Sequence, residues 1–265
     1  MYTRLQLACK YISYYLTASN SRGHGMHSPF VYEFIKKVMN DKTAYPDYEK
    51  VERLRKKLRT DDSVLHIEDF GAGSVHNNTQ QRSISSIAQY AAKPRHFGQL
   101  LYRMVRHYRP QTIIELGTSL GITTSYLALA APEARIISLE GAEALSTAAG
   151  QNLRSLGLTN VTINRGNFDD HLGDVLREIG SVEFGFVDGN HRKEPTERYF
   201  HQMLPYVSNA SILVFDDIHW SREMEQAWNN ICDHPAVSCT IDLFFIGIVL
   251  FRREFKEKQQ FRIRF

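Results

Sequence analysis

Cysteine is scarce in this chain, and no stretch of it stays apolar for long. The 265 residues include three cysteines, Cys9, Cys232 and Cys239, without C-x-x-C spacing. An odd number in this arrangement argues against a disulfide framework and against a zinc site built on thiolates. No apolar run approaches the roughly 20 residues that a membrane span needs. The first ten residues, with Arg4 and Lys10, also lack the apolar core of a signal peptide. We therefore expect a cytoplasmic protein without a membrane partner.

The chain also has little excess charge of either sign. Its formal net charge is +3, with 43% apolar and 23% charged residues, as in ordinary globular proteins. Basic residues gather between Arg53 and Arg59 and again in the tail from Arg252. A solvated helix face explains the first run better than a nucleic-acid surface does, so we expect no nucleic-acid partner.

The first third of the chain is predicted to be mainly helical. Apolar residues recur at helical spacing in two segments, at Leu5, Cys9, Ile12 and Leu16 and at Phe30, Phe34, Ile35 and Val38. Pro29 suits the first turn of the second helix, and a third helix is expected over residues 47–59. We expect residues 1–94 to form a helical cap with loops, attached to a domain over residues 95–265.

Two polar segments of this region are predicted to lie near a substrate. The Gly71-Ala72-Gly73-Ser74 segment and the polar run at 76–83 are expected to form a loop over the active site. The Gly25–Tyr32 segment mixes polar and aromatic groups that could line a substrate entrance, although His27 suits a structural role better than that of a ligand.

From about residue 95 the pattern alternates between helix and strand, which is typical of a parallel sheet flanked by helices. Five buried strands are predicted, at residues 112–115, 135–140, 161–164, 183–188 and 211–216. Two further apolar stretches, 237–242 and 244–251, follow each other too closely for a crossover helix and should pair antiparallel. The expected fold is α/β, a Rossmann-like seven-stranded mixed sheet with an antiparallel closing hairpin.

The strongest local motif is a strand that ends in an acid and a glycine turn. Glu115 ends this strand, and Gly117 and Gly121 would let the backbone approach a ligand closely. About twenty residues later Glu140 ends the next strand, where a carboxylate can accept hydrogen bonds from ribose hydroxyls. Glu115 alone could equally brace a loop or a helix. The combination favours a nucleoside site at the carboxyl ends of the strands.

Several motifs together resemble the catechol O-methyltransferase-like branch of the class I S-adenosylmethionine-dependent methyltransferases. They cover about three-fifths of the chain, namely Glu115-Leu116-Gly117-Thr118-Ser119-Leu120-Gly121, Ser138-Leu139-Glu140, Arg165-Gly166-Asn167-Phe168-Asp169, Phe186-Val187-Asp188 and Val214-Phe215-Asp216-Asp217. The resemblance implies that S-adenosylmethionine is the cofactor. It implies the following contacts: the methionine part at Glu115, Gly117, Ser119 and Gly121, the ribose at Glu140, the adenine at Asn167 and Phe168, and a further contact at Asp188.

Three aspartates follow the fourth and fifth predicted strands. Asp188, Asp216 and Asp217 should meet at one edge of the sheet, where their charges repel one another unless a cation lies between them. The enzymes that this chain resembles carry an asparagine where this chain has Asp217. A divalent cation, Mg²⁺ or Mn²⁺, is therefore predicted at these three residues. The alternative is that Asp217 caps the next helix and no metal binds. His191 and His219 nearby would suit a softer ion.

Methyl transfer also needs a base close to the acceptor. His191 lies three residues after Asp188, where the resembling enzymes carry a lysine, and an imidazole can accept a proton near neutral pH. Lys193 is the competing candidate, and a surface-loop role for His191 is also open. His219 and Trp220 could form an aromatic wall for a planar substrate, or pack in the core.

The sequence thus predicts an S-adenosylmethionine-dependent methyltransferase that transfers a methyl group to oxygen on a small hydroxyl compound. A metal-independent methyltransferase acting on another acceptor and a non-catalytic binding module on the same fold stay open. A NAD-dependent oxidoreductase fits less well, because it would favour G-x-G-x-x-G over the wider Gly117 to Gly121 spacing. The expected partner is a small-molecule substrate, and a homodimer is left open.

Overall fold

The structure is a computed structural model that describes residues 1–19, 21, 23, 28–67 and 81–265. The chain folds into two compact units. The central unit is Asp41–Val175, and the terminal unit combines Met1–Asn40 with Leu176–Phe265. The compact units have other boundaries than the predicted cap and domain. The predicted division at residue 94 stays a prediction.

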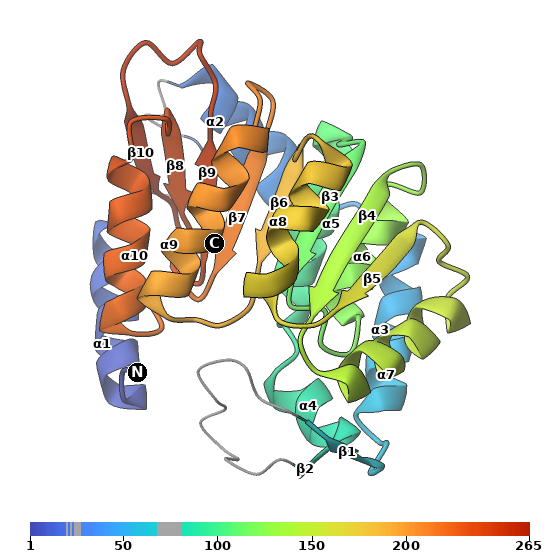
Figure 1. Cartoon of the computed structure of the whole chain (residues 1–265). Helices are drawn as coiled ribbons and strands as arrows, with labels where there is room; N and C mark the ends of the chain where they lie inside the picture. The colour runs from blue at the N-terminus through green and yellow to red at the C-terminus, as the bar shows by residue number, and fades with distance from the viewer. Residues whose placement is uncertain (20, 22, 24–27, 68–80) are drawn as a thin grey trace. The chain divides into compact units, whose positions relative to one another are not determined.

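The central unit contains a parallel set of strands with helices between them (Figure 1). Its helices are α3 (Pro46–Leu58), α4 (Ile84–Tyr90), α5 (Arg95–Tyr108), α6 (Ile122–Ala130) and α7 (Glu143–Ser155). Its strands are β1 (Val64–His66), β2 (Gln81–Ser83), β3 (Thr112–Leu116), β4 (Arg135–Glu140) and β5 (Val161–Arg165). Helix α8 (Phe168–Ile179) spans the boundary between the two units.

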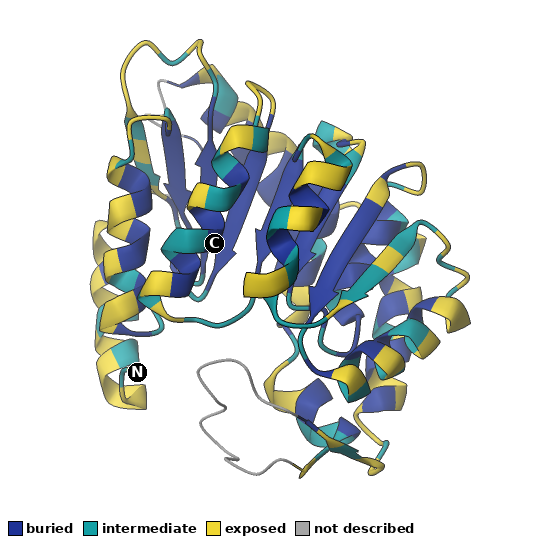
Figure 2. Ribbon diagram, viewed as in Figure 1, coloured by how far each residue is buried: buried dark blue, intermediate teal, exposed yellow. Residues whose placement is uncertain are grey.

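Strands β3, β4 and β5 pair in parallel, in that order. Their register matches Leu116 with Leu139 and Glu140 with Arg165, so all three strands end at nearly the same level. The first two are buried along nearly their whole length, as continuous apolar runs of parallel strands usually are (Figure 2). This register aligns the loops that follow the strands.

The terminal unit contains the rest of the sheet and the first helix (Figure 1). Its helical segments are α1 (Arg4–Thr17), α2 (Pro29–Glu33), a π-helical η1 (Phe34–Met39), α9 (Lys193–Met203), a 3₁₀ turn η2 (Leu204–Tyr206) and α10 (Arg222–Asp233). Its strands are β6 (Phe184–Val187), β7 (Ile212–Asp216), β8 (Cys239–Asp242), β9 (Ile246–Leu250) and β10 (Gln259–Arg262).

In the terminal unit the strand order is β10-β8-β9-β7-β6. Strands β6 and β7 are parallel, β9 lies antiparallel to both β7 and β8, and β10 is parallel to β8. The predicted antiparallel hairpin is confirmed, and the five predicted parallel strands are confirmed to within about one residue at each end.

The mixed sheet has eight strands, so the predicted number of seven is wrong by one. The missed strand is β10, which reads Gln-Gln-Phe-Arg and alternates between half-buried and exposed positions. It lies at the end of the strand order, with one neighbour, so it needs no apolar run that a sequence pattern would reveal. The Rossmann-like α/β architecture itself is confirmed.

Helix α1 is confirmed, and the face formed by its recurring apolar residues is exposed. Leu5, Ile12 and Leu16 are 75%, 58% and 73% exposed, and Cys9 is exposed as well. The buried residues of α1 are instead Tyr14 and the cap residue Ala18, which pack with Phe244. Helical spacing identified an apolar face without revealing that the helix has a second one.

The other helix predictions of the first third are confirmed. Pro29 begins α2, and Phe34, Ile35 and Val38 of the segment that follows are buried. Helix α3 matches the predicted helix over 47–59. The Gly71–Ser74 segment, the start of the polar run at 76–83 and His27 lie outside the described residues. No helix in the described parts of the chain is long and apolar enough to cross a membrane.

Tyr14 of α1 connects this helix by hydrogen bonds to β8 and to the end of β10. Its hydroxyl lies within hydrogen-bond distance of the carbonyl oxygens of Asp242, at 2.9 Å, and of Ile263, and can donate its single proton to them. The Ser19 backbone forms a bridge with Ile263 nearby. Burial raises the pKa of the Tyr14 hydroxyl, so it stays protonated and a donor.

We predict that Tyr14→Phe lowers the free energy of unfolding by about 1–2 kcal/mol, because it removes the Tyr14 donor from the buried Ile263 carbonyl oxygen, while the Asp242 carbonyl oxygen keeps the Ile263 N–H. Urea unfolding followed by circular dichroism measures this change. Tyr15→Phe is the matched control, since Tyr15 is 48% exposed on the same helix and should cost little. Equal stability of the two variants would contradict the fastening role of Tyr14.

Candidate active site

Three loops follow the aligned ends of β3, β4 and β5. The loop after β3 is tied to β4 by a backbone hydrogen bond from Gly117 N–H to Leu139 O, at 2.9 Å. The loop after β5 is tied to the end of β4 by a bond from Gly166 N–H to Glu140 O, at 3.0 Å. Open parallel sheets bind ligands outside the carboxyl ends of their strands, so these loops form a candidate cofactor site.

The loop after β3 has an unusual backbone. Gly117 has φ +105°, Ser119 +49° and Gly121 +76°, and α6 begins directly after Gly121. An added Cβ at Gly121 would lie 3.4 Å from the Cβ of Ala149 and in a backbone conformation that other residues rarely adopt. Gly117 and Ser119 are partly exposed, which leaves their backbone accessible at the edge of the sheet.

Glu115 is completely buried inside the central unit. Its Oε2 accepts hydrogen bonds from Thr124 Oγ1 on α6 and Ser138 Oγ on β4, each at 2.6 Å. The Ser138 hydroxyl in turn lies 2.5 Å from Thr118 Oγ1 in the glycine loop. Glu115 therefore links β3, β4, α6 and the glycine loop. These contacts agree with the alternative interpretation of Glu115 as a residue that braces a loop.

Glu140 ends β4 and joins two loops. Its Oε2 accepts from Ser119 N–H at 2.7 Å, and its Oε1 accepts from Ala142 N–H at 2.9 Å. The residue is only 8% exposed, and burial raises the pKa of its carboxyl, while the backbone donors partly offset that rise. The carboxylate thus sits against the glycine loop, where a ribose would be expected.

Asn167 and Phe168 lie at the start of α8, directly after β5. The Asn167 Oδ1 accepts from Asp169 N–H at 3.1 Å, which caps the helix. Both residues are partly exposed. The structure therefore brings Gly117, Ser119, Glu140, Asn167 and Phe168 to the ends of three adjacent strands, as an adenosine-binding edge requires.

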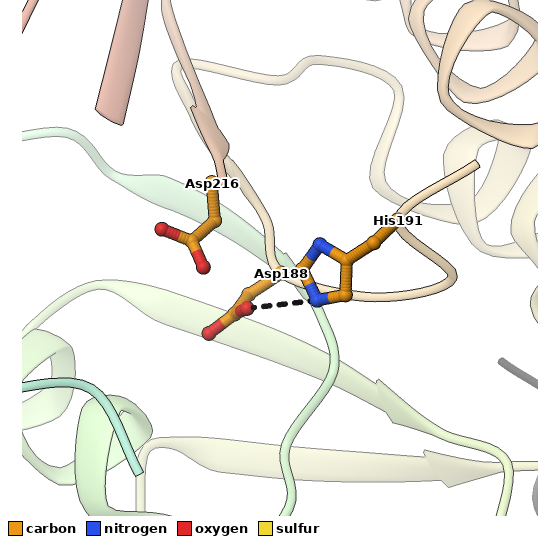
Figure 3. Close-up of side chains that lie close together, drawn as sticks. All are labelled: Asp188, His191 and Asp216. Carbon is orange, nitrogen blue, oxygen red and sulfur yellow. Dashed lines mark ion pairs between the residues drawn. The ribbon is translucent and has the colours of Figure 1, made fainter. Parts of the chain in front are cut away.

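A second group of side chains lies in the terminal unit at the ends of β6 and β7. Asp188, His191 and Asp216 each offer a ligand atom, and these atoms lie within 4.8 Å of one another (Figure 3). His191 Nε2 lies 3.6 Å from Asp188 Oδ1. Asp216 is buried, and the other two are partly buried. Two carboxylates and one imidazole at this spacing fit the donor set of a divalent transition-metal ion.

Comparisons with known proteins agree with this arrangement. A family model described as a methyltransferase domain matches residues 114–218. A catechol O-methyltransferase of Niastella koreensis is 30% identical over 124 residues, which are 46% of this chain and 55% of that protein. The chain thus spans about half the length of this curated relative. Residues 114–218 are thus similar to a methyltransferase domain.

Solved structures share the fold of this chain at low sequence identity. A Podospora anserina methyltransferase with S-adenosylhomocysteine bound has a TM-score of 0.59 at 13% identity, over 95% of this chain and 98% of that one. A Bacillus cereus O-methyltransferase, also in complex with S-adenosylhomocysteine, has a TM-score of 0.54 at 19% identity, over 83% of this chain and 97% of that one. At these identities the likeness concerns the fold.

One predicted ion ligand, Asp217, lies apart from the other two. Asp217 is not in the group formed by Asp188, His191 and Asp216, the one such group found in the described part of the chain. Asp217 has φ +53°, and its N–H donates to Phe245 O at 2.7 Å. His191, expected as a base or as a ligand of a softer ion, lies among the candidate ion ligands. Lys193 is the first residue of α9.

The loop that carries His191 is strained. Asn190 and His191 have φ +65° and +28°, a conformation that costs on the order of 1–3 kcal/mol per residue and is common at functional sites. Asn190 Nδ2 donates to the Tyr199 hydroxyl at 3.2 Å, and Asn190 Oδ1 accepts from Arg192 Nε at 2.8 Å. These bonds help to hold the loop in the conformation that keeps His191 beside Asp188.

His219 is held in a polar cluster within the terminal unit. Its Nδ1 lies 3.1 Å from Glu225 Oε1, and its Nε2 lies 3.0 Å from Asp242 Oδ2. Its ring stacks on Phe244, with centroids 5.0 Å apart. These contacts favour a structural role for His219 over the substrate wall that the sequence suggested, while Trp220 is partly exposed.

Sequence reasoning missed the hydroxyl groups that surround Glu115. Thr118, Thr124 and Ser138 are all buried and lie on three different segments. Isolated Ser and Thr residues carry little signal in a single sequence. The one available hint is that a hydroxyl residue on a buried strand, such as Ser138, needs a hydrogen-bond partner.

The buried Glu140 carboxyl should make the stability of the protein depend on pH. Its folded-state pKa is raised, so its contribution is fully present below the unfolded pKa and is lost as the pH rises through the folded pKa. We predict that the stability of the wild type relative to Glu140→Gln falls as the pH rises above about 4.3, the ordinary pKa of a glutamate side chain. Urea unfolding at a series of pH values measures it. A constant difference would contradict the raised pKa, and Glu143→Gln, at a neighbouring exposed acid, is the control.

Proposed function

We propose that this protein is an S-adenosylmethionine-dependent O-methyltransferase that methylates a hydroxyl group of a small molecule, with a divalent cation held by Asp188, His191 and Asp216. The proposal rests on this group of three ligand atoms within 4.8 Å, in a chain whose residues 114–218 are similar to a methyltransferase domain. Two of the similar proteins, a catechol O-methyltransferase and an O-methyltransferase with bound S-adenosylhomocysteine, support oxygen as the acceptor.

In this proposal the central unit binds the cofactor. The left-handed glycine loop from Gly117 to Gly121 exposes backbone groups to the methionine part, and Glu140 lies close enough to that loop to accept from ribose hydroxyls. Asn167 and Phe168 offer an amide and an aromatic ring for the adenine. Glu115 acts from below the loop as a positioning residue, since it is fully buried behind Thr124 and Ser138.

The terminal unit supplies the cation ligands. A bound divalent cation would lower the pKa of a substrate hydroxyl and orient its oxygen for methyl transfer. Carboxylates alone suit Mg²⁺, whereas an imidazole in the set shifts the preference toward Mn²⁺ or Fe²⁺. We therefore favour Mn²⁺ over Mg²⁺. Asp188 has a role in the cation site rather than at the cofactor in this proposal.

The choice of base follows from the same assignment. An imidazole nitrogen that ligates a cation has no lone pair left to accept a proton. If His191 ligates the cation, Lys193 becomes the favoured base. If no cation binds, His191 regains that role.

We predict that Asp188→Asn and Asp216→Asn weaken Mn²⁺ binding by about 10- to 100-fold, because each replaces a charged ligand by a neutral one. Isothermal titration with Mn²⁺ and Mg²⁺ measures this. Asp217→Asn is the matched control, since Asp217 adjoins Asp216 but lies outside the ligand group. His191→Asn should reduce Mn²⁺ affinity more than Mg²⁺ affinity. If Asp217→Asn were the one variant with a large loss of Mn²⁺ affinity, the proposed ligand set would be wrong and a set that includes Asp217 would replace it.

Removal of the ion should separate catalysis from cofactor binding. We expect exhaustive chelation to abolish methyl transfer to a panel of catechol-like acceptors, to leave S-adenosylhomocysteine binding nearly intact, and to be reversed by Mn²⁺. Full activity of the chelated protein would exclude the metal role and leave a metal-independent methyltransferase with His191 or Lys193 as base. A protein that binds S-adenosylhomocysteine but methylates nothing in the panel would point to another acceptor or to a binding module.

Binding of S-adenosylhomocysteine should raise the melting temperature by mass action, and Glu140→Ala should remove most of that shift. Loosening of the loops alone could also weaken binding, so an analogue that lacks the ribose 2′-hydroxyl is needed. The wild type should prefer the complete ligand over this analogue, and Glu140→Ala should bind both about equally. A variant that keeps the full preference would reject the ribose contact and leave Glu140 as a brace.

A further inference from the structure

Helix α1 has an exposed apolar face that the proposed function does not use. The face consists of Leu5, Ala8, Cys9, Ile12, Tyr15 and Leu16, and we call it the outer face of α1. All six residues are exposed, Leu5 and Leu16 by about three-quarters. Figure 2 shows that much of α1 is exposed. Side chains of this size leave an apolar patch of a few hundred Å² in water, which usually marks an interaction site.

The opposite side of α1 is already occupied. Tyr14 is buried against Phe244, and Leu7 and Tyr11 pack beside them. Lys10 Nζ lies 2.9 Å from Glu225 Oε1 on α10, so the helix is held in one orientation. A helix with apolar residues on both sides is ordinarily buried on both sides. Within the described part of the chain, the outer face of α1 has no such cover.

We propose that a second copy of this chain covers this face, with the two α1 helices packed antiparallel about a two-fold axis. Residues Leu5, Cys9, Ile12 and Leu16 follow one another at intervals of four, three and four. This is the spacing of the seam between two helices that pack side by side at a shallow angle. The outer face of α1 therefore fits the same face of a second α1 helix.

The order of side chains along the seam favours the antiparallel arrangement. A two-fold axis midway between Cys9 and Ile12 places Leu5 opposite Leu16 of the second copy, and Cys9 opposite its Ile12. Each small Cys9 side chain then faces a large Ile12, and the helix dipoles oppose each other favourably. A parallel pair would place two Cys9 side chains together and leave a gap, and would bring the two Arg4 side chains close to each other.

The charges of α1 are compatible with pairing of identical helices. None of the six residues of the outer face is charged, and the flanking positions Gln6 and Ser13 are neutral. Lys10 is held by Glu225 on the other side of the helix. Arg264 lies over the ring of Tyr15 at 4.6 Å, at the edge of the face. The central residues of the face, Leu5, Cys9, Ile12 and Leu16, can therefore meet in two copies without burying a charge, while Arg4 and Arg264 lie at its margin.

The size of the face limits the strength of the dimer. A helix of 14 residues is about 21 Å long, so an α1 pair buries well under the ~800 Å² per partner of a standard interface. We therefore expect a weak dimer that forms with rising concentration. A membrane surface fits less well, because interfacial helices carry several basic residues beside their apolar face. The sequence of helix α1 contains two basic residues, Arg4 and Lys10, and Lys10 lies on the side that faces α10.

Sedimentation velocity from about 1 to about 100 µM tests the proposal. The full chain should shift from monomer toward dimer, and Ile12→Glu should stay monomeric because it would bury a charge in the seam. Val64→Glu is the matched control. Val64 is another β-branched residue, 55% exposed against 58% for Ile12, and lies far from α1 in the sequence. Both positions are exposed, so neither variant should unfold the protein.

A charge exchange tests the register. Leu5→Glu alone should abolish the dimer, and the double variant Leu5→Glu with Leu16→Lys should restore it. In the antiparallel arrangement the introduced glutamate faces the introduced lysine of the second copy. In a parallel arrangement the two glutamates would face each other, and the double variant would stay monomeric.

Cys9 gives an independent readout, because it is the exposed cysteine, while Cys232 and Cys239 are buried. In the antiparallel pair the two Cys9 side chains lie on either side of the axis, on helices 8–10 Å apart, so a short bis-maleimide should cross-link them. Direct disulfide formation on mild oxidation would support the parallel pair and overturn our arrangement.

A monomer at every concentration would overturn the proposal. So would α1-dependent binding to vesicles of phosphatidylcholine and phosphatidylglycerol without dimer formation.

Discussion

Parallel pairing places the carboxyl ends of β3, β4 and β5 at one edge of the central unit. Every residue proposed to hold the cofactor there, from the glycine loop to Phe168, lies at or just past that edge. The register that matches Leu116 with Leu139 and Glu140 with Arg165 keeps the three loops level. A shift of one residue in either pairing would turn buried side chains of that strand outward and separate the loops. The cofactor site is thus a consequence of strand register.

Two buried carboxylates keep these loops in place, and each does so differently. Glu115 lies below the glycine loop and accepts from side-chain hydroxyls of Thr124 and Ser138. Glu140 lies at the loop itself and accepts from the backbone of Ser119 and Ala142. Burial of a carboxylate is unfavourable unless donors surround it. A site that places two acids behind a nucleoside pocket therefore needs the hydroxyls and backbone donors that the fold supplies.

The terminal unit shows how segments far apart in the sequence can serve one structure. Helix α1 and strand β10 lie at opposite ends of the chain, and the Tyr14 hydroxyl joins them through Asp242 and Ile263. The loops after β6 and β7 bring Asp188, His191 and Asp216 together in the same unit. His219, three residues after Asp216, bonds to Glu225, which also binds Lys10 of α1. The N-terminal helix is therefore part of the framework that supports the Asp216 loop.

The sequence by itself determined the parallel strands, the closing hairpin, the glycine loop and the acids that end the strands. Apolar runs between turn signals report burial on both faces of a sheet, which is a local property. Only the tertiary structure decided which apolar face of α1 is buried, since the helix has two and the spacing favours neither. It also decided that His191 joins Asp188 and Asp216 while Asp217 does not, because left-handed backbone at Asn190, His191 and Asp217 sets where those side chains lie. Strand β10 was missed for a related reason: the pairing of an edge strand with β8 depends on backbone hydrogen bonds, which a pattern of side chains does not encode.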